Sequence, residues 1–272
     1  MRKSKKILLP VLALLLVVAT GCQQCKTTTT ADRPADLRWK LAWAEEFDGN
    51  ELDDTVWSKA PRSNADWSSK MSDAEELFEL RDGTLVLKVL ENTFQPNDSL
   101  PFLTGGVWSK GKKSFKMGRI DIKARFDSGQ GFWPALWMLG EGKDWPKGGE
   151  LDIMEHLNHD NFVYQTVHTP YTLSGMKSSP SNHGIAVIDS SEFNIYSVEV
   201  HDDRIVYLVN DQVAFTYPRL PHVDKEEQFP YTDLDFYVIL SAQHGGDWVG
   251  EPNLEVLPLE LQIDFVRYYQ YE

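Results

Sequence analysis

Apolar and polar residues alternate in short runs along most of the chain after the first 38 residues. The opening run has apolar residues at Trp39, Leu41 and Trp43, and the closing run, Leu259–Gln270, is apolar at nearly every second position. A period of two is typical of a strand with one buried face. Further strand-like runs lie at 85–90, 115–125, 195–200, 205–209 and 236–240. No run has the period of a long amphipathic helix, so the pattern predicts an all-β sandwich.

Turn signals lie beside several of these runs. Asp82-Gly83 precedes the run at 85–90, and Asn210-Asp211 follows the run at 205–209. These residue types tolerate positive φ and therefore suit tight hairpins. We expect a hairpin between two antiparallel strands at each of these places.

The N-terminus has a different pattern. Basic residues between positions 2 and 6 precede an apolar run at 7–20, which is typical of a secretory signal peptide. The alternative is a transmembrane helix, but this run is shorter than the ~20 residues that span a bilayer. Ala19-Thr-Gly-Cys22 resembles a bacterial lipobox, which implies a signal peptide at 1–21 and lipidation of Cys22.

A polar, Thr-rich stretch follows at 22–36, and we expect a flexible tether there. It would lead into one folded domain at 37–272. The resemblance to a lipobox implies a bacterial membrane-anchored lipoprotein, in the outer membrane, at the cell surface or in the periplasm. Cys22 and Cys25 are the two cysteines of the chain, so no disulfide framework is expected in the domain. A Cys-x-x-Cys redox pair is the alternative, but the surrounding strand and helix pattern of such a pair is missing.

The net charge narrows the choice of partners. The chain carries 27 basic and 41 acidic residues, and loss of the four basic residues in the leader would leave 23 basic ones and a net charge of −18. Such a charge repels nucleic acid, so we expect none as a partner. It also disfavours strongly acidic polysaccharides, so a neutral polymer would be bound more easily. We expect a monomer.

Three carboxylate residues, Glu150, Asp152 and Glu155, lie within the strand-like run Gly148–Asn158, which is otherwise rich in apolar residues. Glu150 and Asp152 would share a face of a regular strand, whereas Glu155 would point to the other. A bulge at Ile153-Met154 would bring all three to one face, because it inserts one extra residue. Paired carboxylates of this kind serve glycoside hydrolysis, in which one attacks the anomeric carbon and the other protonates the leaving oxygen. Asp152 between two glutamates should raise a neighbouring pKa, and we assign the proton to Glu155.

Glu-Leu-Asp-Ile-Met-Glu resembles the signature of glycoside hydrolase family 16, in the bulged form of its laminarinase-like branch. The resemblance implies a retaining enzyme with nucleophile Glu150, assisting Asp152 and acid/base Glu155. It also implies a β-jelly roll of two curved antiparallel sheets with a concave substrate cleft, and no cofactor for catalysis. A cation site and a solvated acidic face are the alternatives. The segments 131–137 and 145–149 also match the family and speak against both.

Aromatic residues are the candidates for sugar binding. The resemblance places Trp133, Trp137, Trp145 and Trp248 in or beside the cleft, with core packing as the alternative for each. His168, in Tyr-Gln-Thr-Val-His, should lie on the strand next to the catalytic one and reach the site; a histidine satisfied within the core is the alternative.

The resemblance also implies a structural calcium site. Its matching positions are Glu46, Gly83 and Asp264, although Asp264 could equally be an ordinary solvent-facing residue of the closing strand.

The sequence thus predicts an endo-acting β-glycoside hydrolase that cleaves β-1,3 or β-1,4 linkages by double displacement. His-Leu-Asn after Glu155 and Tyr-Gln-Thr-Val-His resemble gut-bacterial surface lipoproteins of the family. This implies either an endo-β-galactosidase on mucin-type O-glycans and poly-N-acetyllactosamine, or an endo-β-1,3(4)-glucanase on laminarin-like or mixed-linkage glucans. A non-catalytic glycan-binding lipoprotein is the alternative from another class.

Overall fold

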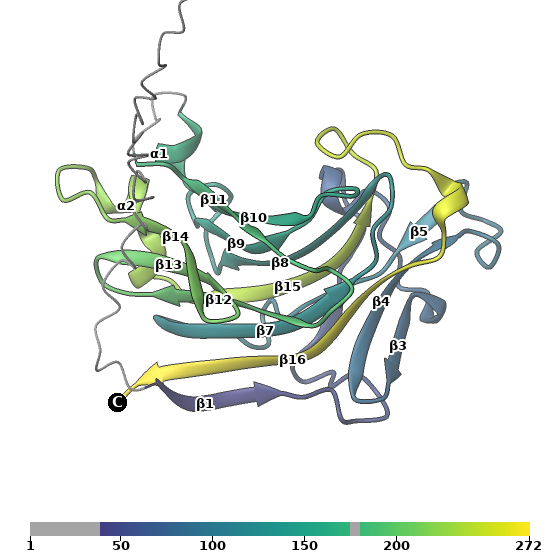
Figure 1. Cartoon of the computed structure of the whole chain (residues 1–272), viewed down its shortest axis with the longest axis horizontal. Coiled ribbons are helices and arrows are strands. Elements are labelled where there is room, and N and C mark those ends of the chain that lie inside the picture. Colours follow the sequence, from purple (N-terminus) through teal and green to yellow (C-terminus); the bar gives the residue numbers. More distant parts are fainter. Residues whose placement is uncertain (1–38, 175–179) are drawn as a thin grey trace, which may run out of the picture. The chain divides into compact units, whose positions relative to one another are not determined.

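The computed structural model describes residues 39–174 and 180–272, and these form two antiparallel sheets stacked face to face (Figure 1). All of them belong to one unit, Pro34–Glu272. The predicted signal peptide, the predicted lipidation site Cys22 and the whole predicted tether lie outside the described residues. No helix of the described ranges is long and apolar enough to cross a membrane.

The first sheet has nine strands. Its order is β14 (Gln212–Pro218), β13 (Arg204–Val209), β12 (Asn194–Val200), β7 (Gly118–Phe126), β16 (Leu259–Tyr271), β4 (Thr84–Glu91) and β3 (Phe78–Arg81), with β1 (Trp39–Glu45) paired to β16 and β5 (Phe102–Thr104) paired to β4. The second sheet has seven strands. Its order is β11 (His183–Val187), β10 (Phe162–His168), β9 (Glu150–Glu155), β8 (Phe132–Gly140), β15 (Phe236–His244), β6 (Gly106–Trp108) and β2 (Ser58–Lys59).

Short helical turns connect the strands. They are α1 (Pro170–Leu173), α2 (Lys225–Gln228) and the 3-10 turns η1 (Asp66–Ser68), η2 (Glu75–Leu77), η3 (Pro230–Thr232) and η4 (Leu254–Val256). The predicted all-β sandwich is therefore confirmed. Asp82-Gly83 and Asn210-Asp211 all have positive φ, as expected for tight hairpins, and they join β3 to β4 and β13 to β14.

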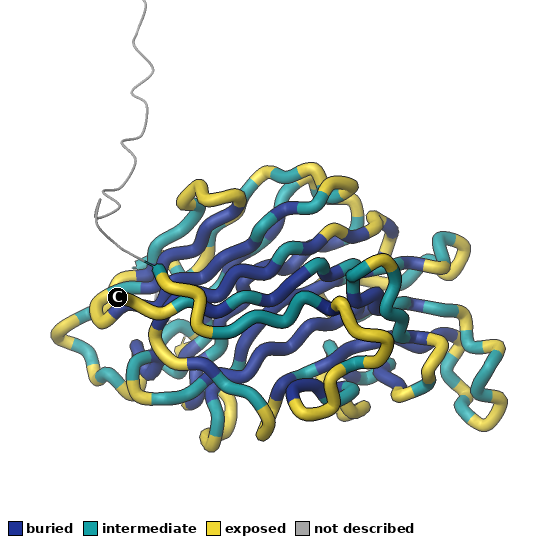
Figure 2. The backbone as a smooth tube through the Cα atoms, turned by 90° about the horizontal axis from the view of Figure 1, so that it is seen from below, coloured by how far each residue is buried: buried dark blue, intermediate teal, exposed yellow. Residues whose placement is uncertain are grey.

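The core lies between the two sheets. Leu87 and Ile122 of the first sheet meet Leu136, Ile153 and Val238 of the second, all fully buried. Figure 2 shows buried positions along the middle of the strands and exposed ones mainly in the connections. Burial of alternate residues on the inner faces accounts for the period of two in the sequence.

The opening strand departs from simple alternation. β1 has a bulge between Leu41 and Trp43, which pair with the adjacent residues Tyr269 and Tyr268 of β16. The extra residue separates two side chains that the pattern had placed on one face. Trp43 packs against the core, whereas Leu41 is half exposed.

Candidate active site

The strand β9 contains the predicted bulge. Asp152 pairs with Trp137 of β8, and Met154 pairs with the preceding residue, Leu136, so Ile153 is the extra residue. The same irregularity appears against β10, on the other side. The side-chain amide of Gln165 donates to the carbonyl of Ile153 at 3.0 Å, so the bulged backbone is satisfied inside the core.

The bulge brings the three carboxylates to one side of the sheet. Glu150, Asp152 and Glu155 all line one cavity of about 480 Å³. Ile153 and Met154 instead point into the core and are fully buried. The predicted sharing of one face is confirmed.

Each carboxylate has a different polar neighbour. The indole N–H of Trp145 donates to Oε2 of Glu150, and that of Trp133 donates to Oε1 of Glu155 at 3.0 Å. Nε2 of His168 lies 3.3 Å from Oδ2 of Asp152. These contacts hold the two glutamates apart along the strand, with the aspartate between them.

Burial makes all three carboxyls hard to ionise. It raises the pKa of Glu150 to about 8, the charge of Asp152 adds to this, and the His168 ring and the Trp145 N–H oppose it. Burial likewise raises the pKa of Asp152. It raises the pKa of Glu155 well above its usual range, helped by the charge of Asp152 and opposed by the Trp133 N–H. A protonated Glu155 beside a more readily ionised Glu150 is the division of roles that acid-assisted nucleophilic attack requires.

Most of the predicted aromatic residues surround these carboxyls. Trp133, Trp145, His168 and Trp248 line the cavity. Trp145 and Trp248 are about half exposed, at 56% and 48%. Their open ring faces are available to the C–H faces of sugars.

Trp137 differs from the other three tryptophans. It lies on the same side of β8 as Trp133, but only 5% of it is exposed, because Trp67 of η1 packs edge-on against it at 4.9 Å. Its indole N–H donates to Ser241 at 3.2 Å, and it is not part of the cavity wall. Contact between Trp137 and a sugar would require Trp67 to move, so in this structure the core-packing alternative holds for Trp137.

The carboxylates proposed as calcium ligands are bound to basic side chains. Both oxygens of Glu46 accept from Arg267, at 2.7 and 2.8 Å, and Asp264 lies 2.5 Å from Nζ of Lys123. Gly83 occupies the β3–β4 turn. In the part of the chain that the structure describes, no group of three or more His, Cys, Asp or Glu side chains could hold a metal ion. The calcium site implied by the resemblance therefore does not fit these contacts.

Three cavity residues were not anticipated from the sequence. Tyr164 and Thr166 precede His168 at intervals of two on β10, and His183 of β11 pairs with Thr166. The resemblance placed His168 in the site, and alternation along the same strand could then have identified Tyr164 and Thr166. His183 depends on the strand pairing. Tyr164 packs edge-on against Trp248 at 5.2 Å and so supports the cavity wall.

Comparison with known proteins gives a consistent set of relatives. The model for glycosyl hydrolases family 16 matches residues 63–267. A keratan-sulfate endo-1,4-beta-galactosidase of Sphingobacterium multivorum is 31% identical over 87% of this chain and 56% of its own length. A beta-glucanase of Rhodothermus marinus is 29% identical over 95% of this chain and 94% of its own length. The chain thus spans little more than half of the first relative and nearly all of the second.

Solved structures agree with these relatives. The laminarinase of Rhodothermus marinus superposes with a TM-score of 0.76 at 26% identity, over 87% of this chain and 99% of that one. A structure described with endo-acting O-glycanases of the human gut microbiota has a TM-score of 0.75 at 27% identity, over 86% of this chain and all of that one. One architecture therefore carries both glucan-directed and O-glycan-directed relatives.

Proposed function

The chain belongs to family 16 of the glycosyl hydrolases, as its carboxylate motif predicted, and from this premise we propose that it is a retaining, endo-acting β-glycosidase. The observation that carries the proposal is the bulged strand β9, which brings Glu150, Asp152 and Glu155 to one cavity. A glycan-binding protein without catalysis would gain nothing from three buried carboxyls, because their burial costs free energy. Family, fold and glycosidase class agree with the comparisons.

In the first step, a carboxylate oxygen of Glu150 attacks the anomeric carbon and forms a glycosyl ester. The bond to the leaving oxygen breaks as Glu155 gives that oxygen its proton. The N–H of Trp145 and the neighbouring His168 ring favour the ionised form of Glu150. Asp152 lies between the two glutamates, and its charge keeps the proton on Glu155.

In the second step, Glu155 acts as a base. It takes a proton from water, the resulting hydroxide attacks the anomeric carbon from the face that the leaving group vacated, and Glu150 departs as a carboxylate. Two inversions give net retention. A sugar hydroxyl in place of water would give transglycosylation.

Two substrate classes remain in the proposal, each with a relative to support it. The Sphingobacterium relative and the gut O-glycanase structure favour an endo-β-galactosidase acting on mucin-type O-glycans or poly-N-acetyllactosamine. The Rhodothermus relatives favour an endo-β-1,3(4)-glucanase. Both are β-linked chains that could lie against the aromatic walls of the cavity.

The test is product analysis by mass spectrometry after incubation with laminarin, mixed-linkage glucan and mucin O-glycans. Glu150→Gln should lower the cleavage rate by about a thousandfold or more, because the attacking carboxylate is lost. The exposed Glu192→Gln is the matched control and should cleave like the parent. Glucan oligomers would assign the protein to the β-glucanases, and short fragments ending in galactose to the endo-β-galactosidases. Glycan binding without cleavage by the parent would instead support the non-catalytic alternative.

We further propose that the protein is a bacterial lipoprotein held at a membrane through Cys22. The support is the charged and apolar leader at 1–21, the lipobox-like Ala19–Cys22 and the Thr-rich stretch at 22–36. An anchor at the outer membrane or cell surface would bring the cavity to polymeric substrates. We expect a monomer whose partner is a glycan and not a nucleic acid.

A further inference from the structure

The segment His156-Leu157-Asn158 directly follows the proposed catalytic acid, and the proposed chemistry does not use it. β9 ends at Glu155. Nε2 of His156 lies 2.7 Å from the carbonyl oxygen of Asp160, and the side chain of Leu157 is buried. These two residues fix the turn that leaves the strand, whereas the side chain of Asn158 reaches two other loops.

The side-chain amide of Asn158 makes one hydrogen bond to each of these loops. Its Oδ1 accepts from the backbone N–H of Gly131 at 2.7 Å, and its Nδ2 donates to the backbone carbonyl of Val249 at 3.2 Å. Gly131 lies two residues before Trp133, and Val249 follows Trp248. Both tryptophans line the catalytic cavity. One side chain thus connects the end of the catalytic strand to the segments that carry both tryptophans.

The backbone at position 158 limits which residue types can make this connection. Asn158 has a φ of 56°, a conformation that Gly, Asn and Asp adopt most readily. Glycine has no side chain, and an ionised aspartate only accepts, whereas a carboxamide both donates and accepts. The backbone of Asn158 also bonds to Phe132 and Gly129, at 2.9 and 3.1 Å. Those two bonds do not involve the side chain, so side-chain variants test the amide alone.

The ring of Trp248 is not held in place by burial. It is 48% exposed and meets Trp133 and Tyr164 edge-on, at 5.6 and 5.2 Å between ring centroids. Such ring contacts are individually weak, so the position of the indole depends on the backbone that carries it. Glycine gives a loop much conformational freedom. The loop 245–250 contains three glycines with positive φ, Gly245, Gly246 and Gly250.

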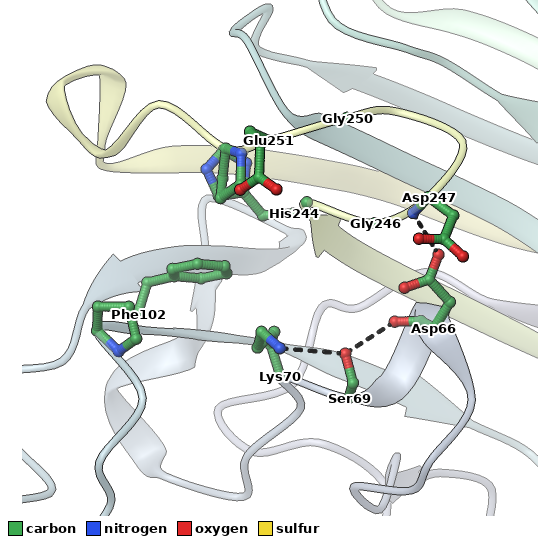
Figure 3. Close-up of a pocket in the computed structure, with 12 residues that line it drawn as sticks. Asp66, Ser69, Lys70, Phe102, His244, Gly246, Asp247, Gly250 and Glu251 are labelled. Atoms are coloured by element: carbon green, nitrogen blue, oxygen red, sulfur yellow. Dashed lines mark hydrogen bonds between the residues drawn. The ribbon is translucent and has the colours of Figure 1, made fainter.

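The backbone on either side of Trp248 is anchored by a side chain from another segment. On one side, the N–H of Asp247 donates to Oδ2 of Asp66 at 2.8 Å, as Figure 3 shows. On the other side, the carbonyl of Val249 accepts from Asn158. Loss of the second anchor would leave the loop attached at Asp66 but would free the indole to move.

We infer that Asn158 is a positioning residue of the proposed glycosidase, whose amide holds Trp248 in the wall of the catalytic cavity. Asn158 itself lies outside the residues that line this cavity, so it acts through the tryptophan. The effect on cleavage rests on the proposed function. The position of Trp248, however, can be measured without any substrate.

The first measurement is ¹⁹F nuclear magnetic resonance of the protein labelled with 5-fluorotryptophan. Asn158→Asp keeps the acceptor for Gly131 but cannot donate to Val249 once the carboxyl is ionised. The signal of Trp248, identified by its loss in Trp248→Phe, should then move towards that of free 5-fluorotryptophan. An unmoved signal would overturn the inference, whether or not the parent cleaves glycans. A moved signal in a parent that cleaves none of the three glycans would support the role of Asn158 and contradict the proposed function.

Asn92→Asp is the matched control. Asn92 also accepts from a backbone N–H, that of Gln95 at 3.0 Å, and donates to the carbonyls of Asp98 and Leu100 at 3.0 Å. It belongs to the loop after β4, in the first sheet. The same chemical change there should leave the signal of Trp248 in place.

The second measurement is steady-state kinetics on whichever of the three glycans the parent cleaves. Asn158→Asp should raise KM about tenfold and change kcat less than about twofold, because a sugar contact is weakened and the reacting groups remain. A purely structural role would lower the active fraction, and therefore kcat, at constant KM. That pattern, or kinetics equal to those of the parent, would contradict the inference.

The third measurement repeats the kinetics in a Trp248→Ala background. Since Asn158 acts through this indole, Asn158→Asp should raise KM less than about twofold once the indole is gone. A full tenfold rise in that background would show that Asn158 acts by another route. If Asn158→Asp fails to fold, Asn158→Gly replaces it in all three measurements, with Asn92→Gly as its control, because glycine accepts the positive φ. The same three results are expected, and failure of any one of them would overturn the inference.

Discussion

The indole of Trp133 contacts Glu155, the proposed catalytic acid, through one hydrogen bond. Its N–H donates to Oε1 of Glu155 at 3.0 Å, and the same ring packs edge-on against Trp248 at 5.6 Å. A donor to a carboxylate favours the ionised form and lowers the pKa of the acid. Trp133 therefore moderates the pKa increase that burial imposes on Glu155, while its ring forms part of the wall.

Trp133→Phe should shift the pH dependence of cleavage. The ring remains but the N–H is lost, so the pKa of Glu155 rises and the enzyme keeps its catalytic proton to higher pH. We expect the alkaline limb of the plot of kcat/KM against pH to move to higher pH by about one pH unit. A shift of this size corresponds to the free energy of one hydrogen bond to a charged group. Trp39→Phe is the control, because the buried indole N–H of Trp39 has no hydrogen-bond partner and lies on the other sheet. An unchanged or lowered limb in Trp133→Phe would contradict the role given to this contact.

Glu155→Gln should stabilise the fold, increasingly so as the pH rises. The pKa of Glu155 is raised in the folded protein by burial and by Asp152, so its contribution to stability is complete below the unfolded pKa of about 4 and is lost as pH rises towards the folded pKa. The glutamine amide in the variant does not ionise, so the variant does not lose this stability as pH rises. At neutral pH we expect a gain of roughly 1–2 kcal/mol, or a few degrees in Tm, together with loss of activity.

The measurement is thermal unfolding of the parent, Glu155→Gln and Glu192→Gln across the pH range. The difference in Tm between the parent and Glu155→Gln should shrink below about pH 4, where the carboxyl of Glu155 is protonated in both the folded and the unfolded state. A difference that is constant across the pH range would show that the effect has another origin.

At the scale of elements, the bulge of β9 depends on a side chain from β10. Gln165 is fully buried, and its amide N–H satisfies the carbonyl of Ile153. The residues on either side of it on the same face of β10, Val163 and Val167, are apolar core residues. Gln165 thus faces the core and supports the cleft from behind.

Gln165→Leu should both destabilise the protein and slow cleavage. The Ile153 carbonyl would lose its partner in the core, which costs about 1–3 kcal/mol in the free energy of unfolding. The freed backbone would also hold Glu155 less firmly, so kcat should fall more than KM changes. Gln262→Leu, on the other sheet and with side-chain contacts to Arg125 and Glu260, is the matched control and should leave kcat unchanged. Equal kcat values in Gln165→Leu and the parent would refute the support role.

Alternation alone predicts most of the strands and part of the site. The runs at 195–200 and 205–209 agree closely with β12 and β13, and the closing run agrees with β16. The β9 bulge was also predictable, because three carboxylates on a buried strand are tolerable only if they share a face. The bulge in β1 was not, since nothing in the run Trp39–Trp43 shows that its partner strand skips a residue there.

The contacts that the sequence did not anticipate involve residues whose neighbours come from distant parts of the sequence. Trp137 is covered by Trp67, which belongs to a short 3-10 turn without a periodic signal. Glu46 and Asp264 meet Arg267 and Lys123 only because β1, β16 and β7 are adjacent in the first sheet. Side-chain pairing across strands depends on register, which residue spacing within one strand does not contain.

At the scale of the whole molecule, the N-terminal leader should decide where the enzyme works. Cys22→Ser should move the protein from the membrane fraction to the soluble fraction of the expressing bacterium, because the thiol that would carry the lipid is lost. Fractionation followed by immunoblotting measures this, and Cys25→Ser is the control. A protein that stays with the membrane in Cys22→Ser would contradict lipid anchoring at that residue.

The bulge of β9 also bears on how such a gene can change. Deletion of the single codon for Met154 would restore a regular strand and still leave Glu150, Asp152 and Glu155 on one face. It would, however, return the Ile153 carbonyl to the ladder and leave the Gln165 amide without a partner in the core. A lineage could therefore exchange the bulged strand for a regular one only if position 165 mutated as well, so the two forms of the motif are separated by a barrier of two linked mutations.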